Sequence, residues 1–372
     1  MKAKRIIAGC AISLAASIAL IAIGLMILGK GMGWLYEHRW AKSPGPPRVV
    51  QGDALLSRQP FLADNRLWNG ITDIRLGQLD GKPGMDVGIA GPLGAVIMTT
   101  DGADSSYVAF SGDRNFVEIV DVGQDGVCEF MDRGGHGCKP TLMDHAGKTI
   151  WTFHLPYARD TASGDVDGDG KLEFAVGYDF GTRLALLDET GGELWRQDAA
   201  HAHSLAMVDA NQDGKLEILS TGERFVILRD NTGRVLKRSR APQYIFASST
   251  CAWPDGRHRK KCLLITDRNA LRLLDYDGRV VASFDAPQCS DMWDAYGTLV
   301  KLKRNQPEFF AVIAGPWPGD GAALYVYDAT KALVYQEVLS SGLAIAAIPA
   351  DWPGEDQLLV GGDGRVWSYT AN

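Results

Sequence analysis

The sequence predicts an all-β protein: a seven-bladed β-propeller of four-stranded blades, preceded by one N-terminal transmembrane helix. Three observations support this prediction. An acidic loop followed by a short apolar strand recurs about every 44 residues, short strands ending in polar turns fill the chain from about residue 65 onward, and residues 6–28 carry no charged side chain. A self-similarity of about 40 to 45 residues is typical of propellers, in which each repeat forms one blade.

Residues 6–28 form an uncharged apolar segment that follows a basic start. At about 1.5 Å per residue, a helix of this length reaches about 34 Å, which is enough to cross the hydrocarbon core of a membrane. The run is longer than the apolar part of a signal peptide, and no clean A-x-A cleavage site follows it. We therefore expect a cytoplasmic tail over residues 1–5 and a signal-anchor helix over residues 6–28. A cleaved signal peptide is one alternative, and a lipoprotein is another because Ile7-Ala8-Gly9-Cys10 resembles a lipobox.

Residues 29–47 separate the predicted helix from the folded part. This juxtamembrane linker ends in Ser43-Pro44-Gly45-Pro46-Pro47, and proline-rich segments are extended and stiff. Residues 48–372 then form the predicted propeller. Its last repeat stops at Asn372 before a fourth strand, and closing the ring removes the open edges of the sheets. We therefore expect an N-terminal strand over about residues 48–56 to complete the last blade.

Each predicted blade begins with a strand that leads into a loop, and a second short apolar strand follows that loop. Most of the third strands end in a polar turn, as at Asp188–Trp195. The first strands of the seven blades are predicted at Ile71–Leu79, Phe116–Val122, Thr161–Val166, Ser204–Ala210, Ile245–Trp253, Tyr296–Lys303 and Leu343–Ala350.

The loop after the third of these strands has the composition of a calcium site. Asp165, Asp167 and Asp169 alternate along it, and Glu173 follows four residues later. Crowded carboxylates repel one another unless a cation neutralises them, and Ca²⁺ accepts six to eight oxygen ligands in flexible geometry. An EF-hand would need a glutamate at its twelfth position and a helix on each side, whereas that position is Val176 in a strand-like segment. A solvated acidic turn is the alternative to a metal site.

The loop recurs in the neighbouring blades. A second copy lies 44 residues later, from 165 to 209, and a weaker copy lies 44 residues earlier, from 165 to 121. The second copy offers Asp209, Asn211, Asp213 and Glu217; the weaker copy offers Asp121, Asp125 and Glu129, with Gly123 at the middle position. Lysines and arginine at Lys301, Lys303 and Arg304 exclude a site in blade six, and the loops of blades one and seven are degenerate. We therefore expect two strong Ca²⁺ sites and a third, weaker one.

These loops resemble those of the FG-GAP and VCBS repeat propellers, whose best-known members are the integrin α-chain head domains. The turn at Asp188–Trp195 also resembles pyrroloquinoline-quinone-type propeller repeats. The resemblance covers roughly residues 65 to 372, and its motifs specify architecture much better than activity. It implies that the acidic side chains of the two stronger loops bind Ca²⁺, with the backbone carbonyls of Lys171 and Lys215 as further ligands.

Cysteine usage and the predicted calcium sites point to a compartment outside the cytoplasm. Cys251 and Cys262 flank the loop of blade five, and Cys128 and Cys138 bracket a short segment of blade two, so each pair is placed to staple a hairpin. Buried thiols are the alternative. No N-x-[ST] sequon occurs beyond the apolar segment, which favours a bacterial periplasmic or cell-surface protein over a eukaryotic one.

The loops on the face opposite the acidic loops collect aromatic and charged residues, a composition that suits protein or glycan recognition. The candidates are Trp68, Tyr157, Arg159, Asp160, His201, His203, Tyr244, Asp291, Trp293, Asp294 and Trp317. The alternative is that several of these rings pack between blades. His201-Ala202-His203 alone is a weak zinc signal because a third ligand is missing.

Several function classes are excluded or disfavoured. A net charge of −7 and a pI near 5.5 give no sign of a nucleic-acid partner. No G-x-S-x-G, H-E-x-x-H, Walker or Rossmann pattern is present, and we assign no catalytic residue. The sequence therefore predicts a membrane-anchored, calcium-binding module for a protein or glycan ligand. The alternative is an enzyme, either a polysaccharide lyase or glycosidase or a quinoprotein-like enzyme; clustered carboxylates facing an arginine in the central funnel would favour it.

Overall fold

The computed structural model divides the chain into two units, Met1–Gly45 and Pro46–Asn372, and all residues described below lie in the second. The described residues are 48–52, 54–67, 70–100, 105–110, 116–134, 139–154, 158–178, 183–198, 202, 204–245, 248–255, 258–267, 270–287, 294–302, 307–315, 322–339, 344–348, 357–362 and 365–372. The predicted tail, transmembrane helix and linker, residues 1–47, lie outside them. Within the described residues, no helix is long and apolar enough to cross a bilayer.

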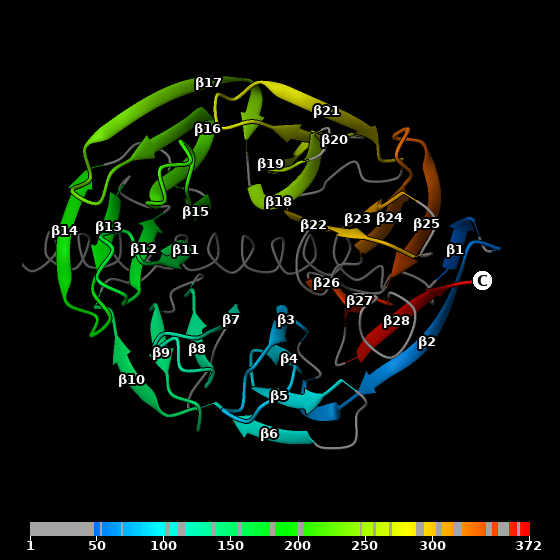
Figure 1. Ribbon diagram of the computed structural model, residues 1–372, viewed down its shortest axis with the longest axis horizontal. Helices are drawn as coiled ribbons and strands as arrows, with labels where there is room; N and C mark the ends of the chain where they lie inside the picture. The colour runs from blue at the N-terminus through cyan, green and yellow to red at the C-terminus, as the bar shows by residue number, and fades with distance from the viewer. Residues whose placement is uncertain are drawn as a thin grey trace, which may run out of the picture. The chain divides into compact units, whose positions relative to one another are not determined.

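The second unit is an all-β propeller in which seven antiparallel sheets surround a central axis (Figure 1). The predicted fold class is confirmed for this part of the chain. In every blade the first strand lies nearest the axis and the last strand lies at the rim. A single 3₁₀ turn at Asn65–Leu67 precedes the first blade.

The strands follow one another around the ring in sequence order. Blade one contains β3 (Asp73–Gly77), β4 (Asp86–Gly91), β5 (Gly94–Thr99) and β6 (Ser105–Ala109), and blade two contains β7 (Val117–Val120), β8 (Glu129–Asp132), β9 (Thr141–Met143) and β10 (Thr149–Thr152). Blade three contains β11 (Ala158–Gly164), β12 (Glu173–Tyr178), β13 (Arg183–Leu187) and β14 (Glu193–Asp198), and blade four contains β15 (Ser204–Val208), β16 (Glu217–Arg229) and β17 (Val235–Ile245).

The second half of the ring is built in the same way. Blade five contains β18 (Ser248–Asp255), β19 (His258–Asp267), β20 (Ala270–Leu274) and β21 (Val280–Asp285). Blade six contains β22 (Asp294–Val300), β23 (Phe309–Gly315), β24 (Ala322–Tyr327) and β25 (Leu333–Leu339), and blade seven contains β26 (Ala344–Ile348), β27 (Gln357–Gly361) and β28 (Arg365–Ala371).

Blade four has three strand elements because β16 takes the place of two strands. Its residues up to Thr221 pair with β15, and its residues from Glu223 onward pair with β17. The backbone of Glu223 has a φ of 50°, in the left-handed region that marks a tight change of direction. The blade therefore keeps four strand positions although one element spans two of them.

The hydrophobic core lies between neighbouring blades. Every residue of β4, β12, β23 and β24 is buried, because the middle strands of a blade are covered on both faces. Between blades five and six, for example, the ring of Trp253 packs edge-on against Phe284 and Phe310 at centroid distances of 5.3 and 5.4 Å. Close approach also demands a glycine, since a Cβ on Gly177 would lie 2.4 Å from the carbonyl oxygen of Ala202. The two middle strands consequently form continuous apolar runs in the sequence.

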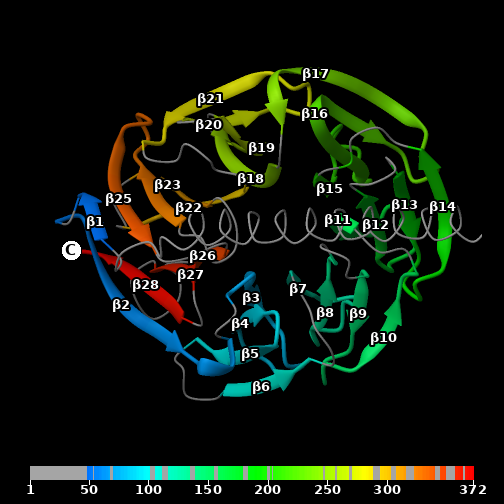
Figure 2. The same cartoon turned by 180° about the vertical axis from the view of Figure 1, so that it is seen from behind.

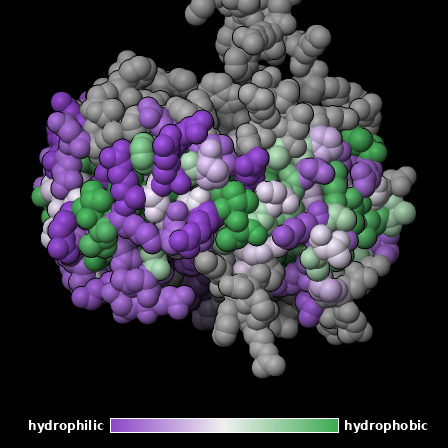
Figure 3. All heavy atoms as spheres, turned by 90° about the horizontal axis from the view of Figure 1, so that it is seen from above, coloured by the Kyte–Doolittle hydropathy of each residue, from purple (hydrophilic) through white to green (hydrophobic). Residues whose placement is uncertain are grey.

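The rim is mixed in character. Figure 3 looks at one side of it and shows hydrophobic residues as separate patches among hydrophilic ones. Exposed apolar side chains on the outer strands include Ile150, Leu194, Val235, Leu236 and Val280. Scattered surface residues of this kind are normal in soluble domains and do not define a binding surface.

The inner strands are sheet edges, and their backbone groups find partners in the adjacent blade. The Oδ2 atom of Asp73 in β3 accepts a hydrogen bond from the amide of Ile119 in β7 at 2.8 Å. Asp160 in β11 accepts one from the amide of Leu205 in β15, also at 2.8 Å. The hydroxyl of Ser249 in β18 donates to the carbonyl of Ala295 in β22 at 2.6 Å. Polar side chains therefore tie blade to blade around the axis.

The ring is closed by an N-terminal strand, but not by the residues that the sequence predicts. The closing strand is β2 (Leu56–Ala63), which pairs antiparallel with β28 from Leu56 and Ala371 to Ala63 and Arg365 (Figure 2). Residues 48–51 instead form β1, a fifth strand that pairs with β25 of blade six. The prediction of a closing strand over residues 48–56 is thus wrong in position.

The error has a physical origin. Pro60 makes residues 56–63 a poor strand candidate in sequence, yet β2 is an outer edge strand, where the missing N–H of proline is tolerated. The pairing is irregular between Pro60 and Leu62, as expected at such a position. Val49 and Val50 are a better strand signal, but both are exposed at the rim.

A buried carboxylate joins the two ends of the ring. Glu337 of β25 is fully buried and accepts hydrogen bonds from the hydroxyls of Tyr335 at 2.8 Å and Tyr369 of β28 at 2.9 Å. It also forms an ion pair with Arg58 of β2, whose guanidinium stacks over the ring of Trp367. Burial raises the pKa of Tyr335 to about 12, so the phenol remains a donor at neutral pH. Strands of blades six and seven and the closing strand therefore share one polar contact.

The predicted bridge between Cys251 and Cys262 is not present in the structure. The two residues lie directly opposite each other on β18 and β19, and both are buried, but the structure has them as thiols. Burial raises the pKa of Cys251 and favours the protonated form. Cys128 is also a buried free thiol, so its predicted bridge to Cys138, a residue outside the described ones, is not formed in the structure either.

We predict that Arg58→Ala lowers the free energy of unfolding by about 2 kcal/mol, because it leaves the Glu337 carboxylate buried without its cation. The Arg58 side chain is 27% exposed, which keeps the cost below that of a fully buried pair. Equilibrium urea unfolding measures the change. The matched control is Arg365→Ala, an exposed arginine on β28, with an expected effect within about 0.5 kcal/mol. Equal effects of the two substitutions would contradict this role for the ion pair.

Candidate metal centres

The acidic loop of blade three connects β11 to β12 and is curled by its own hydrogen bonds. The two carboxylate oxygens of Asp165 accept the amides of Gly168 at 2.6 Å and Gly170 at 2.9 Å. Both glycines have positive φ, 86° and 87°, a conformation that costs a side-chain-bearing residue free energy. Glu173, the first residue of β12, accepts the amide of Val166 at 2.9 Å. These hydrogen bonds bring the acidic side chains at the two ends of the loop close together.

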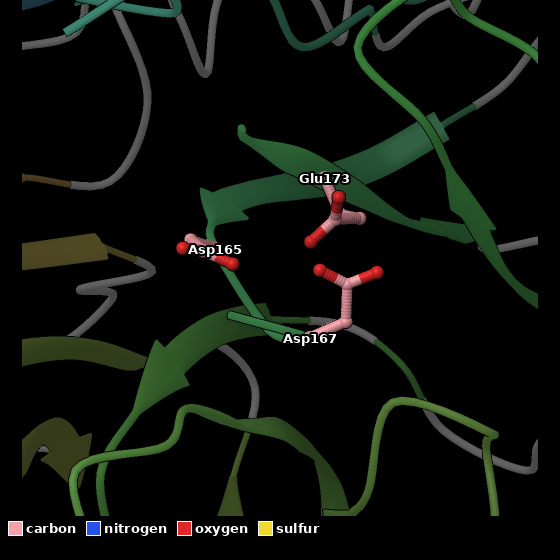
Figure 4. A group of neighbouring side chains, drawn as sticks. All are labelled: Asp165, Asp167 and Glu173. Atoms are coloured by element: carbon pink, nitrogen blue, oxygen red, sulfur yellow. The ribbon is translucent and has the colours of Figure 1, made fainter. Parts of the chain in front are cut away.

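Three of the four predicted carboxylates meet there (Figure 4). Asp165, Asp167 and Glu173 each offer an oxygen, and these atoms lie within 4.8 Å of one another. Asp169 accepts the amide of Lys171 at 2.8 Å and is not part of this cluster. Oxygen ligands from carboxylates, at this mutual separation, fit a hard divalent cation such as Ca²⁺.

The electrostatics of the loop favour a cation. Burial raises the pKa of Glu173, and the neighbouring charges of Asp167, Asp169 and Asp165 raise it further. The ammonium of Lys171 does not relieve this repulsion fully, because it pairs with Glu189 at 2.5 Å. A bound divalent ion would reverse the effect by stabilising every ionised carboxylate at once.

The loop of blade four has the same backbone but a different arrangement of side chains. Asp209 accepts the amides of Asp213 at 3.1 Å and Gly214 at 3.0 Å, and Glu217 accepts the amide of Ala210 at 2.8 Å. The amide nitrogen of Asn211 donates to Asp213 at 3.0 Å and to Glu217 at 3.2 Å. A neutral donor therefore sits among the carboxylates here, and a metal ion would require the amide to present its oxygen instead.

The loop of blade two keeps the scaffold without the middle ligand. Asp121 accepts the amides of Asp125 at 3.2 Å and Gly126 at 3.1 Å, and Glu129 accepts the amide of Val122 at 2.9 Å. Asp121 and Asp125 also line a cavity of about 420 Å³ between this loop and β3. Burial, followed by the charges of Asp125 and Asp121, raises the pKa of Glu129.

Blade one shows the same carboxylate position, here an aspartate, in a loop that lacks the acidic cluster. Asp86 accepts the amide of Leu79 at 3.0 Å, seven residues earlier, just as Glu129, Glu173 and Glu217 do in their own loops. The ammonium of Lys82 pairs with Asp80 at 2.8 Å. The sequence analysis did not assign this role to Asp86. Its position relative to the first strand is nevertheless the same as that of the three glutamates.

The corresponding loops of blades five, six and seven are only partly covered by the described residues. In blade five, β18 and β19 continue into a hairpin that pairs as far as Asp255 and His258, and the described part of that loop has no acidic cluster. Residues 303–306 of blade six and 349–356 of blade seven lie outside the described residues.

Most of the predicted ligand-face residues cannot be placed from the described residues. Trp68, Tyr157, His201, His203, Asp291, Trp293 and Trp317 lie outside them, and for Tyr244 in β17 and Asp294 in β22 only the strand is described. Arg159 and Asp160 lie in β11, Arg159 half-buried and Asp160 buried. Asp160 belongs to a group of charged residues near the propeller axis that the sequence reading missed.

This group, called the axial cluster below, consists of Asp73, Glu118, Arg133 and Asp160. The guanidinium Nη1 of Arg133, which follows β8, lies 3.0 Å from Asp160 Oδ1 and 3.3 Å from Glu118 Oε1. The four residues come from blades one, two and three, and the first strands carry the three carboxylates. Burial is the main cause that raises the pKa of Glu118 to about 7. The charges of Asp73 and Asp160 also raise this pKa, and the charge of Arg133 lowers it.

Comparison with known proteins supports the fold alone. No family model matches the chain, and no curated protein matches it in sequence. Solved structures share the architecture at low identity. BBS1N, from its complex with ARL6DN, has a TM-score of 0.55 and 13% identity over 87% of this chain and 98% of that chain. A streptogramin B lyase has a TM-score of 0.56 and 12% identity over 87% and 100% of the two chains. The virginiamycin B lyase from Staphylococcus aureus has a TM-score of 0.53 and 10% identity over 85% and 98%. The chain is therefore a seven-bladed β-propeller in its described part.

We predict that the blade-three loop binds Ca²⁺ more tightly than the blade-four loop, because it has four acidic side chains where the other has three and an amide. Asp167→Ala should weaken the tighter of the two calcium binding events by about tenfold or more, while Asn211→Ala should weaken the other event. Isothermal titration calorimetry separates the two. Loss of the tighter event in Asn211→Ala would reverse the assignment.

We also predict that Gly123→Asp creates a stronger calcium site in blade two. A Cβ at this position would lie 3.5 Å from the carboxylate of Asp125, an ordinary contact, and Gly123 is not among the residues with positive φ. Calorimetry of this variant should show one more high-affinity binding event than the wild-type chain. Gly123→Asn is the matched control for added charge, and an unchanged stoichiometry in Gly123→Asp would show that the scaffold is not sufficient.

Proposed function

We propose that this protein is a calcium-binding propeller held at a membrane by residues 6–28, with the propeller outside the cytoplasm, and that it acts as a binding or scaffolding module for a protein partner. The single observation that carries the proposal is the convergence of Asp165, Asp167 and Glu173 within 4.8 Å, on a loop whose backbone pattern recurs in the adjacent blades. Calcium at millimolar concentration is available outside cells, where modules of this kind bind it. The FG-GAP and VCBS resemblance of these loops supports the same assignment.

The binding role follows from the architecture. A closed propeller presents many loops on a rigid frame, and loops on rigid frames commonly carry binding residues. The BBS1N propeller was solved in complex with ARL6DN, so a protein of similar fold binds a protein partner. A glycan ligand remains an expectation of the same loop face and has no separate support among the described residues.

An enzyme is the second candidate, and one observation favours it. In the axial cluster, Glu118 pairs with Arg133 and has a pKa of about 7, close to the value that suits a general base at neutral pH. Two lyases share the fold. Against this candidate, Asp73 and Asp160 already accept backbone amides, so only one carboxylate of the cluster is available, whereas glycosidases use two. We therefore prefer the binding role.

The test is thermal unfolding of the full-length chain in EDTA and then with about 1 mM Ca²⁺, a concentration typical of extracellular modules. A ligand that binds only the native state raises the unfolding midpoint by mass action. A ligand concentration of about 100 times its Kd stabilises the native state by about 2.7 kcal/mol per site. We expect a clear rise that Asp167→Ala and Asn211→Ala together abolish. Mg²⁺ at the same concentration is the control for ionic strength. An unchanged midpoint with Ca²⁺ would reduce these loops to acidic turns and remove the main support for an extracytoplasmic location.

A further inference from the structure

We propose that the axial cluster is the docking site for a basic side chain, arginine or lysine, of a protein partner. The inference rests on the proposed binding function and names the chemistry of its partner. It is carried by three carboxylates from three different blades, two of which share one arginine, together with an arginine nitrogen that is buried without an acceptor.

The charge balance of the cluster favours a cation. Asp73, Glu118 and Asp160 contribute three negative charges when all of them are ionised, whereas Nη1 of Arg133 serves both Glu118 and Asp160. Arg75 of β3 lies nearby, but its guanidinium donates to the backbone carbonyl of Ile119 at 2.6 Å. Even with both arginines counted, the group carries one excess negative charge. An anionic ligand would have to displace a carboxylate from Arg133, so anions are disfavoured.

Glu118 is the member of the cluster that is available to a ligand. Asp73 and Asp160 each use an oxygen to hold an amide of the next blade. Glu118 has no such bond to an amide among the described residues, and its side chain is 35% exposed, so solvent reaches it. Burial is the main cause of its raised pKa, and the charges of Asp73 and Asp160 raise the pKa further; an additional cation nearby would lower it.

A metal ion fits the axial cluster less well than an organic cation. Among the described residues, only Asp165, Asp167 and Glu173 bring three ligand oxygens within 4.8 Å of one another, and the axial carboxylates do not. Ca²⁺ needs several oxygens at 2.3–2.6 Å from one point. A guanidinium or ammonium group has donors spread over several ångströms and can reach carboxylates that stay apart.

The buried Nε of Arg133 distinguishes a peptide from a simple amine. This donor has no hydrogen-bond acceptor within the described part of the chain, and an unsatisfied buried donor costs free energy. Because Nε has no accessible surface, it gains an acceptor only if Arg133 turns toward the ligand. A peptide supplies a backbone carbonyl next to its basic side chain, so the carbonyl can then accept from Nε while the basic group compensates Glu118. A polyamine has no acceptor to offer.

The test measures binding of a blocked, fluorescein-labelled octapeptide of alternating glycine and arginine to the full-length chain by fluorescence polarisation, with spermidine as competitor. Glu118→Gln should weaken binding by about tenfold, as expected when one partner of a charge pair is removed. The matched control is Glu193→Gln on β14, which removes a carboxylate that also pairs with an arginine, Arg196, but lies at the rim. The control should change affinity by less than about twofold.

The pH dependence provides a second readout. A cation binds the ionised form of Glu118, so affinity should rise between pH 6 and pH 8, the range that brackets its pKa of about 7, by up to about tenfold. The groups that face Glu118 are Asp73 and Arg75 from β3, Arg133 after β8 and Asp160 from β11. The peptide arginines do not titrate in this range. Because Glu118→Gln has no group to titrate at this position, its binding should be independent of pH over the same range.

Two results would overturn the inference. Equal affinities of Glu118→Gln and Glu193→Gln would show that the peptide responds only to the overall negative charge, and tighter binding of spermidine than of the peptide would exclude peptide recognition. If Glu118→Gln fails to fold, a wild-type affinity that does not change between pH 6 and pH 8 overturns the inference instead. Each result is separate from the proposed function, since a calcium-dependent rise in the unfolding midpoint is measured without any peptide.

Discussion

The fold depends on one constraint: a ring of sheets is stable only when its last blade is completed. Here the strand Leu56–Ala63 completes it by pairing along the C-terminal strand Arg365–Ala371. The buried Glu337 carboxylate joins this closure to blade six, because it binds Arg58 of the closing strand and two tyrosine hydroxyls. Strands far apart in sequence are thereby fixed together, and the acidic loops of blades two, three and four are held on this frame. The loops can then hold charges at separations that a free peptide would not maintain.

The acidic loops combine a structural and a metal-binding property in the same residues. The carboxylate at the start of the second strand accepts an amide seven residues earlier in blades one to four, whether or not the other ligands are present. This hydrogen bond shapes the loop. Burial of the carboxylate raises the pKa of Glu173 and Glu217, although the hydrogen bond itself lowers it. The repulsion between that carboxylate and its neighbours is what a divalent cation would relieve. Blade one, with Lys82 paired to Asp80, lacks the acidic cluster and retains the shape.

The sequence predicted the parts of this structure that depend on short-range patterns. Asp165, Asp167 and Glu173 lie within nine residues, so their spacing alone indicates a common site, and the repeat of that spacing indicates the blades. The closing strand was misplaced because Pro60 obscures the edge strand at residues 56–63, whereas Val49 and Val50 belong to β1, which pairs with blade six instead. The axial cluster was missed because Glu118, Arg133 and Asp160 come from two blades and share no local motif. Contacts of that kind depend on the ring geometry, which spacing along the chain does not reveal.

The most direct test of the account is a crystal structure of the protein with calcium. We expect one ion in the blade-three loop, with oxygens of Asp165, Asp167 and Glu173 at about 2.3–2.6 Å and with the Lys171 carbonyl turned toward it. We expect a second ion in the blade-four loop, with the Asn211 amide rotated so that its oxygen faces the metal. Loops without an ion at millimolar calcium, with the Asn211 nitrogen still donating to Asp213 and Glu217, would contradict the central claim.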